Sequence, residues 1–82
     1  NVEAWSGKGL AQYDTEDVDG AIQSFRKALS IFDSYTEAQM GLAECLKKKG
    51  NNKEAIEYYK KVAESSSPDA AAAQQALEQL KN

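Results

Sequence analysis

The 82-residue sequence contains no histidine and a single cysteine, Cys45. Without histidine, the chain lacks the commonest general base and the commonest transition-metal ligand, and it cannot form a Ser–His or Cys–His nucleophile pair. A single cysteine also excludes an internal disulfide framework and a cysteine-rich zinc site. We therefore expect a protein that is not an enzyme and that holds no metal and no cofactor.

Proline and glycine are scarce, with one and five residues, and this scarcity favours helices over a turn-rich β architecture. Long apolar runs are also missing: the longest are about four residues, whereas a membrane-spanning helix needs about 20. The formal net charge of −3 and the lack of a basic stripe argue against a dedicated nucleic-acid binder. We expect no membrane insertion and no nucleic-acid partner.

Length and composition indicate one small domain spanning residues 1–82. Apolar residues make up 41% of the chain and charged residues 28%, which are ordinary values for a globular domain and not for a disordered tract. The sequence begins at Asn1 without a basic and then apolar leader, so we interpret it as a fragment or a processed chain.

The chain repeats itself at a spacing of 34 residues. Aligning residues 2–35 with residues 36–69 gives six identities without a gap, where about two are expected by chance at ordinary composition. The identical pairs are Glu3 and Glu37, Ala4 and Ala38, Gly7 and Gly41, Ala21 and Ala55, Ile22 and Ile56, and Lys27 and Lys61. The sequence therefore predicts two full units, 2–35 and 36–69, and the opening of a third unit, 70–82.

Each full unit is predicted to contain two helices joined by a short turn. In residues 18–32, apolar side chains recur at steps of three and four residues, which is the stripe of an amphipathic helix. Along the whole chain, helices are predicted over 2–14, 18–32, 36–49, 52–65 and 69–81. Five short helices joined by turns predict an all-α helix-turn-helix repeat solenoid, in which each helix packs on its neighbours.

Residues typical of helix ends stand between these segments. Ser34–Glu37 and Asn51–Glu54 both have the form of a capping box, and Asp17 can cap the helix that follows it. Lys47–Gly50 is typical of a helix end, with cations near the negative pole of the helix dipole and a glycine for a left-handed turn. Pro68 is expected at the first position of the fifth helix, where no amide is missed.

The 34-residue helix–turn–helix unit resembles the tetratricopeptide repeat, which carries large and small residues in set places. The residues on that pattern are Trp5, Gly9, Ala21, Phe25 and Ala28 in the first unit, and Leu42, Ala43, Ala55 and Tyr59 in the second. Lys8 and Gln12 depart from it, because the family has leucine and tyrosine in those places. The resemblance covers the whole chain. The large side chains expected in the core are Trp5, Phe25, Leu46 and Tyr59.

In tetratricopeptide repeats the first helices of successive units line a concave groove that receives an extended or helical peptide. The resemblance therefore implies a protein-interaction scaffold. Projecting that groove onto this chain selects the candidate partner-binding residues Ser6, Leu10, Tyr13, Met40, Glu44, Lys47, Lys48 and Gln74. The expected partner is a protein or peptide segment, and Lys47 with Lys48 would orient an acidic group on it.

Leu10, Tyr13 and Met40 carry the binding prediction, because packing within a repeat leaves their face uncovered. An exposed apolar strip rimmed by charge is typical of a binding site. Two alternatives stay open: these side chains contact each other, or the fifth helix covers them. The clamp with which chaperone-adaptor members hold carboxylates is not expected, because Ser6, Leu10 and Gly41 occupy its places.

Other functional interpretations have less support in the sequence. The acidic cluster 14–19 lacks the ligand spacing and the closing glutamate of a calcium loop, so it is interpreted as a solvated turn with a helix cap. Cys45 takes the place of Ala11 at a small inward site, which predicts a buried thiol and not a nucleophile. The alternative to peptide binding is a structural segment of a longer repeat array, or a self-associating oligomerisation module.

Overall fold

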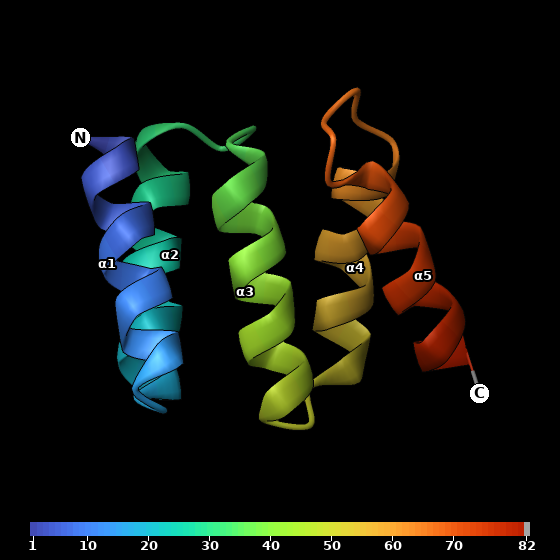
Figure 1. Ribbon diagram of the computed structural model, residues 1–82, viewed down its shortest axis with the longest axis horizontal. Coiled ribbons are helices and arrows are strands. Elements are labelled where there is room, and N and C mark those ends of the chain that lie inside the picture. The colour runs from blue at the N-terminus through green and yellow to red at the C-terminus, as the bar shows by residue number, and fades with distance from the viewer. Residues whose placement is uncertain (82) are drawn as a thin grey trace.

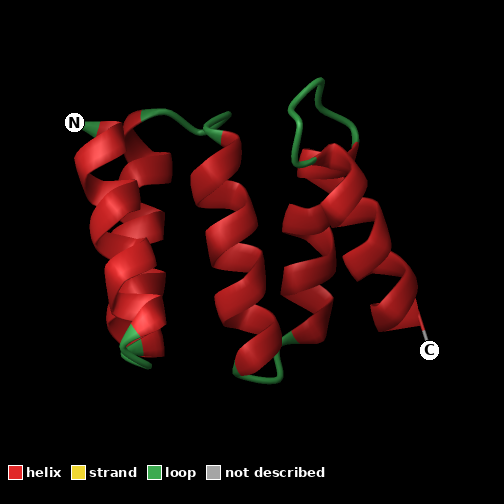
Figure 2. Ribbon diagram, in the orientation of Figure 1, coloured by secondary structure: helices red, strands yellow, loops and turns green. Residues whose placement is uncertain are grey.

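The protein consists of five α-helices in a computed structural model, which describes the backbone of residues 1–81 and the side chains of residues 1–80 (Figure 1). The helices are α1 (Val2–Asp14), α2 (Val18–Ile31), α3 (Thr36–Lys48), α4 (Asn52–Ala63) and α5 (Ala70–Lys81). Helix is the only regular structure in residues 1–81, as Figure 2 shows. The predicted all-α fold is confirmed, with helix ends within two residues of the predicted ones. Residue 82, the last of the predicted third unit, lies outside the described residues.

The helices stack in chain order, and the loops between them lie at alternating ends of the stack (Figure 2). Each helix contacts the next one along the chain, and α1 also contacts α3. Helices α1 and α5 lie at opposite ends of the long axis (Figure 1). Because α1 touches α3 across the boundary between the first two units, the first helices of the units share one side of the stack.

The core is built around two aromatic side chains fitted between small residues. Phe25 of α2 and Tyr59 of α4 hold equivalent places in their units, and both are almost completely buried. The ring of Phe25 lies against Gly9 of α1 and Gly41 of α3. A Cβ atom at Gly9 would stand 2.8 Å from a ring atom, and one at Gly41 would come closer still. The predicted core positions Phe25, Leu46 and Tyr59 are confirmed.

Trp5 differs from the other predicted core residues, because it is only half-buried. It packs against the core, but the amines of Lys8 and Lys27 lie 5.2 and 5.9 Å from its ring centre. Gln39, which holds the same place in the second unit, is buried. Trp5 stays partly exposed because, in the described part of the chain, α1 has neighbours on one side only.

Two of the turns follow the sequence closely. Asp17 caps α2 as predicted, its carboxylate accepting a hydrogen bond of 3.1 Å from the amide of Gly20. Gly50 has the predicted left-handed backbone, with a φ of +88°. Glu16 holds the equivalent place in the first unit and has a φ of +67°, a conformation that is unfavourable for a residue with a side chain.

The two predicted capping boxes do not form. Asn51 is the residue before α4, but its side chain makes no capping hydrogen bond. The residue before α3 is Tyr35 and not Ser34, whose hydroxyl donates to the preceding carboxylate instead. Pro68 lies in the loop before α5 and not inside the helix. A short polar residue near a helix start offers a cap, but the local backbone path decides whether its side chain reaches the free amides.

Candidate partner-binding site

A cavity of about 270 Å³ opens on the side of the stack that α1, α3 and α5 share. Its lining includes Tyr13 of α1, Met40, Glu44 and Lys47 of α3, Tyr59 of α4, and Gln75 and Gln79 of α5. Four of the eight predicted groove residues are therefore brought together around one cavity: Tyr13, Met40, Glu44 and Lys47.

The spacing along α3 explains why its residues share this cavity. Met40, Glu44 and Lys47 are separated by four and three residues, and side chains at these spacings lie on one helix face. Tyr13 holds in the first unit the place that Lys47 holds in the second. Lys48 stands beside the cavity: its amine lies 5.2 Å from the centre of the Tyr13 ring, a distance typical of a cation–π contact.

Two predicted groove residues of α1 lie outside this cavity. Leu10 is 46% exposed and stands one turn before Tyr13, so it extends the apolar surface along α1 without lining the cavity. Ser6 is only 1% exposed, and its hydroxyl has no hydrogen-bond partner among the described residues. The projection onto Ser6 fails because α1 contacts both α2 and α3, which leaves this residue inaccessible to a partner.

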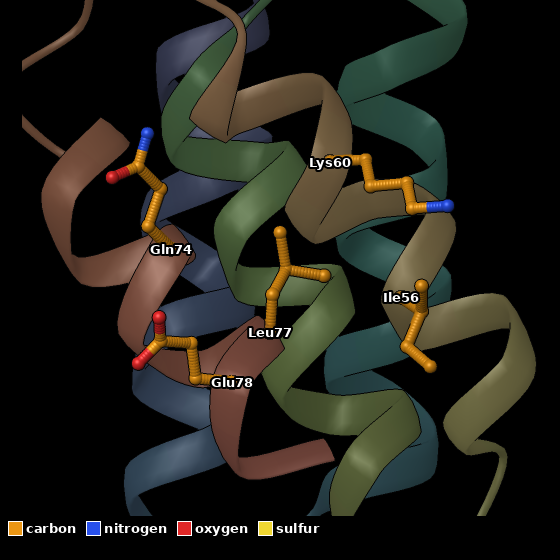
Figure 3. Close-up of a pocket in the computed structure, with 5 residues that line it drawn as sticks. All are labelled: Ile56, Lys60, Gln74, Leu77 and Glu78. Carbon is orange, nitrogen blue, oxygen red and sulfur yellow. The ribbon is translucent and has the colours of Figure 1, made fainter. Parts of the chain in front are cut away.

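The structure also places Gln74 outside the cavity. Gln74 stands on another side of α5, at a cleft of about 480 Å³ between α4 and α5. The residues that line this cleft, which Figure 3 shows, are Ile56, Lys60, Gln74, Leu77 and Glu78. The next residue along the chain, Gln75, takes the place in the cavity that the sequence predicted for Gln74.

A one-residue offset in the third unit explains this exchange. Ala38 of α3 and Ala73 of α5 are both completely buried, and they stand 35 residues apart instead of 34. The same offset relates the two glutamines that line the cavity to Met40 and Glu44. The buried face of α5 is therefore shifted by one residue relative to that of α3, and it follows a connection of six residues (64–69), whereas α3 follows one of four (32–35).

Glu44 brings a half-buried carboxylate into the cavity. Burial raises the pKa of this carboxyl, while Lys47 lowers it and Asp69 raises it further. Burial and then the charge of Glu44 also raise the pKa of two tyrosines that line the cavity, Tyr13 and Tyr59, the latter to about 12. Among the charged groups, Glu44 therefore has the largest effect on the pKa of both tyrosines.

Cys45 lies beside this site, but it is poorly suited to act as a nucleophile. Its side chain is completely buried, as predicted. Burial, with a smaller contribution from Glu44, raises the pKa of the thiol to about 11, so the reactive thiolate is scarce at neutral pH. Within residues 1–81, no three acidic or cysteine side chains are grouped so that they could hold a metal ion. None of the described helices is long and apolar enough to cross a membrane.

The comparisons with known proteins agree with this architecture. A family model described as tetratricopeptide repeat matches residues 12–80, from the end of α1 to the end of α5. No curated protein gives a match. The family match includes every residue that lines the cavity between α1, α3 and α5.

Proposed function

The chain belongs to the tetratricopeptide repeat family, whose repeats generally mediate protein–protein interaction, and on this premise we propose that it binds a partner segment in the cavity between α1, α3 and α5. The supporting observation is the composition of that cavity, where three helices present aromatic, methionine, amide and charged side chains together. Such a mixture is typical of peptide recognition. The role needs no catalysis, and the family fold is typically a non-enzymatic scaffold.

Several side chains in and beside the cavity have distinct parts in the proposed binding. Tyr13 and Met40 supply apolar contact, because an aromatic ring and a thioether give large areas of adaptable shape. Gln75 offers an amide that can donate to and accept from a peptide backbone. Lys47 and Lys48 are exposed at the edge, where they can orient an acidic group of the partner.

The chain offers a matched pair of tyrosines for the experiment. Tyr13 and Tyr58 are both half-buried, and each has a lysine amine over its ring, at 5.2 and 5.0 Å. Tyr58 lines a different depression, which it shares with residues of α2. Peptides selected from a displayed random library for binding to the whole chain should bind Tyr13→Ala about tenfold more weakly. The same peptides should bind Tyr58→Ala within about twofold of the parent affinity.

The lysines at the edge are tested in the same way. The double variant Lys47→Ala with Lys48→Ala should bind acidic peptides more slowly at low salt and little differently at high salt, because exposed charges are screened beyond about 8 Å. Lys60→Ala with Lys61→Ala is the control on α4. Binding in this cavity would be contradicted by selected peptides whose affinity is unchanged by both cavity variants. The same holds if their affinity falls on Tyr58→Ala or on the control pair instead.

A second candidate function is self-association through the cleft between α4 and α5. Ile56 and Leu77 are half-buried there, so a docked helix could cover further apolar surface. Sedimentation equilibrium separates the two candidates. A mass that stays monomeric as concentration rises supports peptide binding, whereas a dimer that dissociates on Leu77→Glu would favour the structural role.

A further inference from the structure

The Glu44 carboxylate is the most unusual polar group of the cavity. It is half-buried, yet it takes part in no ion pair among the described residues, whose two salt bridges are Arg26–Glu54 and Lys49–Asp19. It also has no hydrogen-bond partner among the described side chains and backbone amides. A carboxylate that loses water on burial is stabilised when a cation comes within a few ångströms. Glu44 is therefore the group of the cavity with which a positive group would pair, beside the single amine of the lining, that of Lys47.

The surroundings of Glu44 favour the same kind of ligand. The half-buried Tyr13 lines the cavity with it, and aromatic faces attract cations. The Tyr13 ring already has one cation, the Lys48 amine, at 5.2 Å from its centre. An acidic side chain placed deep in this cavity would meet Glu44 at close range, and like charges repel. Acidic groups of a partner are therefore restricted to the edge of the cavity.

We propose that the cavity accepts an arginine or lysine side chain of the partner segment, with Glu44 as its counter-ion and the Tyr13 ring as one wall. The proposal rests on the peptide-binding function proposed above and specifies the partner for it. Gln75 and Gln79 of α5 provide amide oxygens that can accept further hydrogen bonds from a guanidinium group.

The charges on α3 also set a spacing for the partner. Lys47 follows Glu44 by three residues, so the two side chains are neighbours on one helix face, about 5–6 Å apart. An extended peptide advances about 3.3 Å per residue. The acidic residue that Lys47 orients should therefore stand about two residues from the basic residue that Glu44 binds. The recognised segment combines both charges within a short stretch.

Glu44→Gln tests the proposal, because it removes the charge and keeps the shape of the side chain. Glu57→Gln is the matched control, since Glu57 is exposed and stands on α4 away from the cavity. The probes are peptides selected from a displayed random library against the whole parent chain. We expect the selected peptides to share a basic residue at one position. They should bind Glu44→Gln about tenfold more weakly and Glu57→Gln within about twofold of the parent.

A pair of small probes tests the charge directly, without selection. N-acetyl-arginine amide carries the guanidinium group, and N-acetyl-citrulline amide is its neutral analogue of nearly the same shape. In amide NMR spectra of the whole labelled chain, the arginine probe should shift the signals of Tyr13, Glu44 and Gln75, and the citrulline probe should not. Glu44→Gln should abolish the response to arginine. Lys47→Ala should strengthen it, because the variant removes a competing cation.

The outcomes separate this inference from the proposed function. Some selected peptides could depend on Tyr13 for binding and yet lack a basic residue, or bind Glu44→Gln as tightly as the parent. Either result would overturn the cationic ligand and leave the proposed peptide binding intact. A failure to obtain any peptide that depends on Tyr13 would overturn both. Equal shifts from the arginine and citrulline probes would also overturn the role of charge.

Discussion

Helices α1 and α3 hold equivalent places in successive units, yet their environments differ sharply. Two residues of α1 are buried, Ser6 and Gly9, whereas seven residues of α3 are buried. The difference follows from the neighbours, because α3 packs between α2 and α4 while α1 packs against α2 and part of α3. Even identical residues change environment: Ala38 is completely buried, and Ala4, its repeat equivalent, is exposed.

The comparison shows what a repeated sequence specifies and what it leaves to position in the stack. Gly41 is needed because the Phe25 ring occupies the space where its Cβ would be. Gly7 holds the same place in the first unit, and a Cβ built there would have nothing within 4 Å. Both units therefore have a glycine at this position, although packing requires the glycine only in the second unit.

The largest effect is expected from removing the aromatic ring that joins the first two units. Phe25→Ala should lower the free energy of unfolding by about 3–5 kcal/mol, because the ring is completely buried between two glycines. Trp5→Ala should cost clearly less, since Trp5 is half-buried on α1, the first helix of the stack. Urea denaturation measures both. Equal losses for the two variants would contradict the difference in burial between Trp5 and Phe25.

Thiol reactivity should differ by position as strongly as packing does. Cys45 is buried with a thiol pKa raised to about 11, whereas its repeat equivalent Ala11 is exposed. In a Cys45→Ala background, Ala11→Cys should react with a thiol reagent at pH 8 about a hundredfold faster than native Cys45, since two pKa units change the thiolate population by that factor. Similar rates under native conditions would contradict the burial of Cys45.

The raised pKa of Cys45 also predicts the sign of a pH dependence. The folded thiol keeps its proton at pH values where the unfolded thiol, with a pKa near 9, has lost it. Its contribution to stability is therefore complete below pH 9 and is lost as the pH rises through about 11. Denaturation midpoints measured from pH 8 to 11 should fall faster for the parent chain than for Cys45→Ala.

One substitution at two equivalent glycines should have opposite effects. Gly41→Ala should destabilise by about 1–3 kcal/mol, because the new methyl group would overlap the buried ring of Phe25. Gly7→Ala should stabilise by up to about 1 kcal/mol, because alanine is the better helix former and the site is open. Thermal and urea denaturation give both signs. A destabilised Gly7→Ala would mean that this face of α1 is covered.

The smallest expected effects concern the two equivalent turns. Gly50→Ala should cost about 1 kcal/mol, because its left-handed backbone disfavours a side chain. Glu16→Gly should stabilise by a few tenths to about 1 kcal/mol, since Glu16 adopts the same conformation with a side chain present. Denaturation midpoints of the two variants measure both changes in stability. A loss of stability in Glu16→Gly would show that the Glu16 side chain has a role beyond the turn.

Much of the fold could be predicted from sequence, because its signals are local and repeated. The spacing of apolar residues predicted α2 correctly, and the glycine at position 50 predicted the turn after α3. The capping boxes failed, because a cap depends on the backbone path as well as on the residue present. The half-exposed Trp5 was missed, since burial depends on neighbours that the residue itself does not specify.

The site was predicted in part for the same reason. Residues of α3 were placed correctly around the cavity, because their spacing along one helix fixes their common face. The prediction for α5 missed by one position, Gln74 for Gln75, because the buried face of α5 is shifted by one residue relative to α3, and one residue corresponds to about 100° around a helix. Ser6 was predicted from its face alone and is buried by the packing of α1.

The most direct test locates a bound peptide on the structure. A peptide selected against the whole chain is titrated into the labelled protein, and amide NMR shifts are mapped residue by residue. We expect the largest shifts at Tyr13, Met40, Glu44 and Gln75, which three helices bring to one cavity. Shifts concentrated instead at Ile56, Lys60 and Leu77, in the cleft between α4 and α5, would contradict binding between α1, α3 and α5.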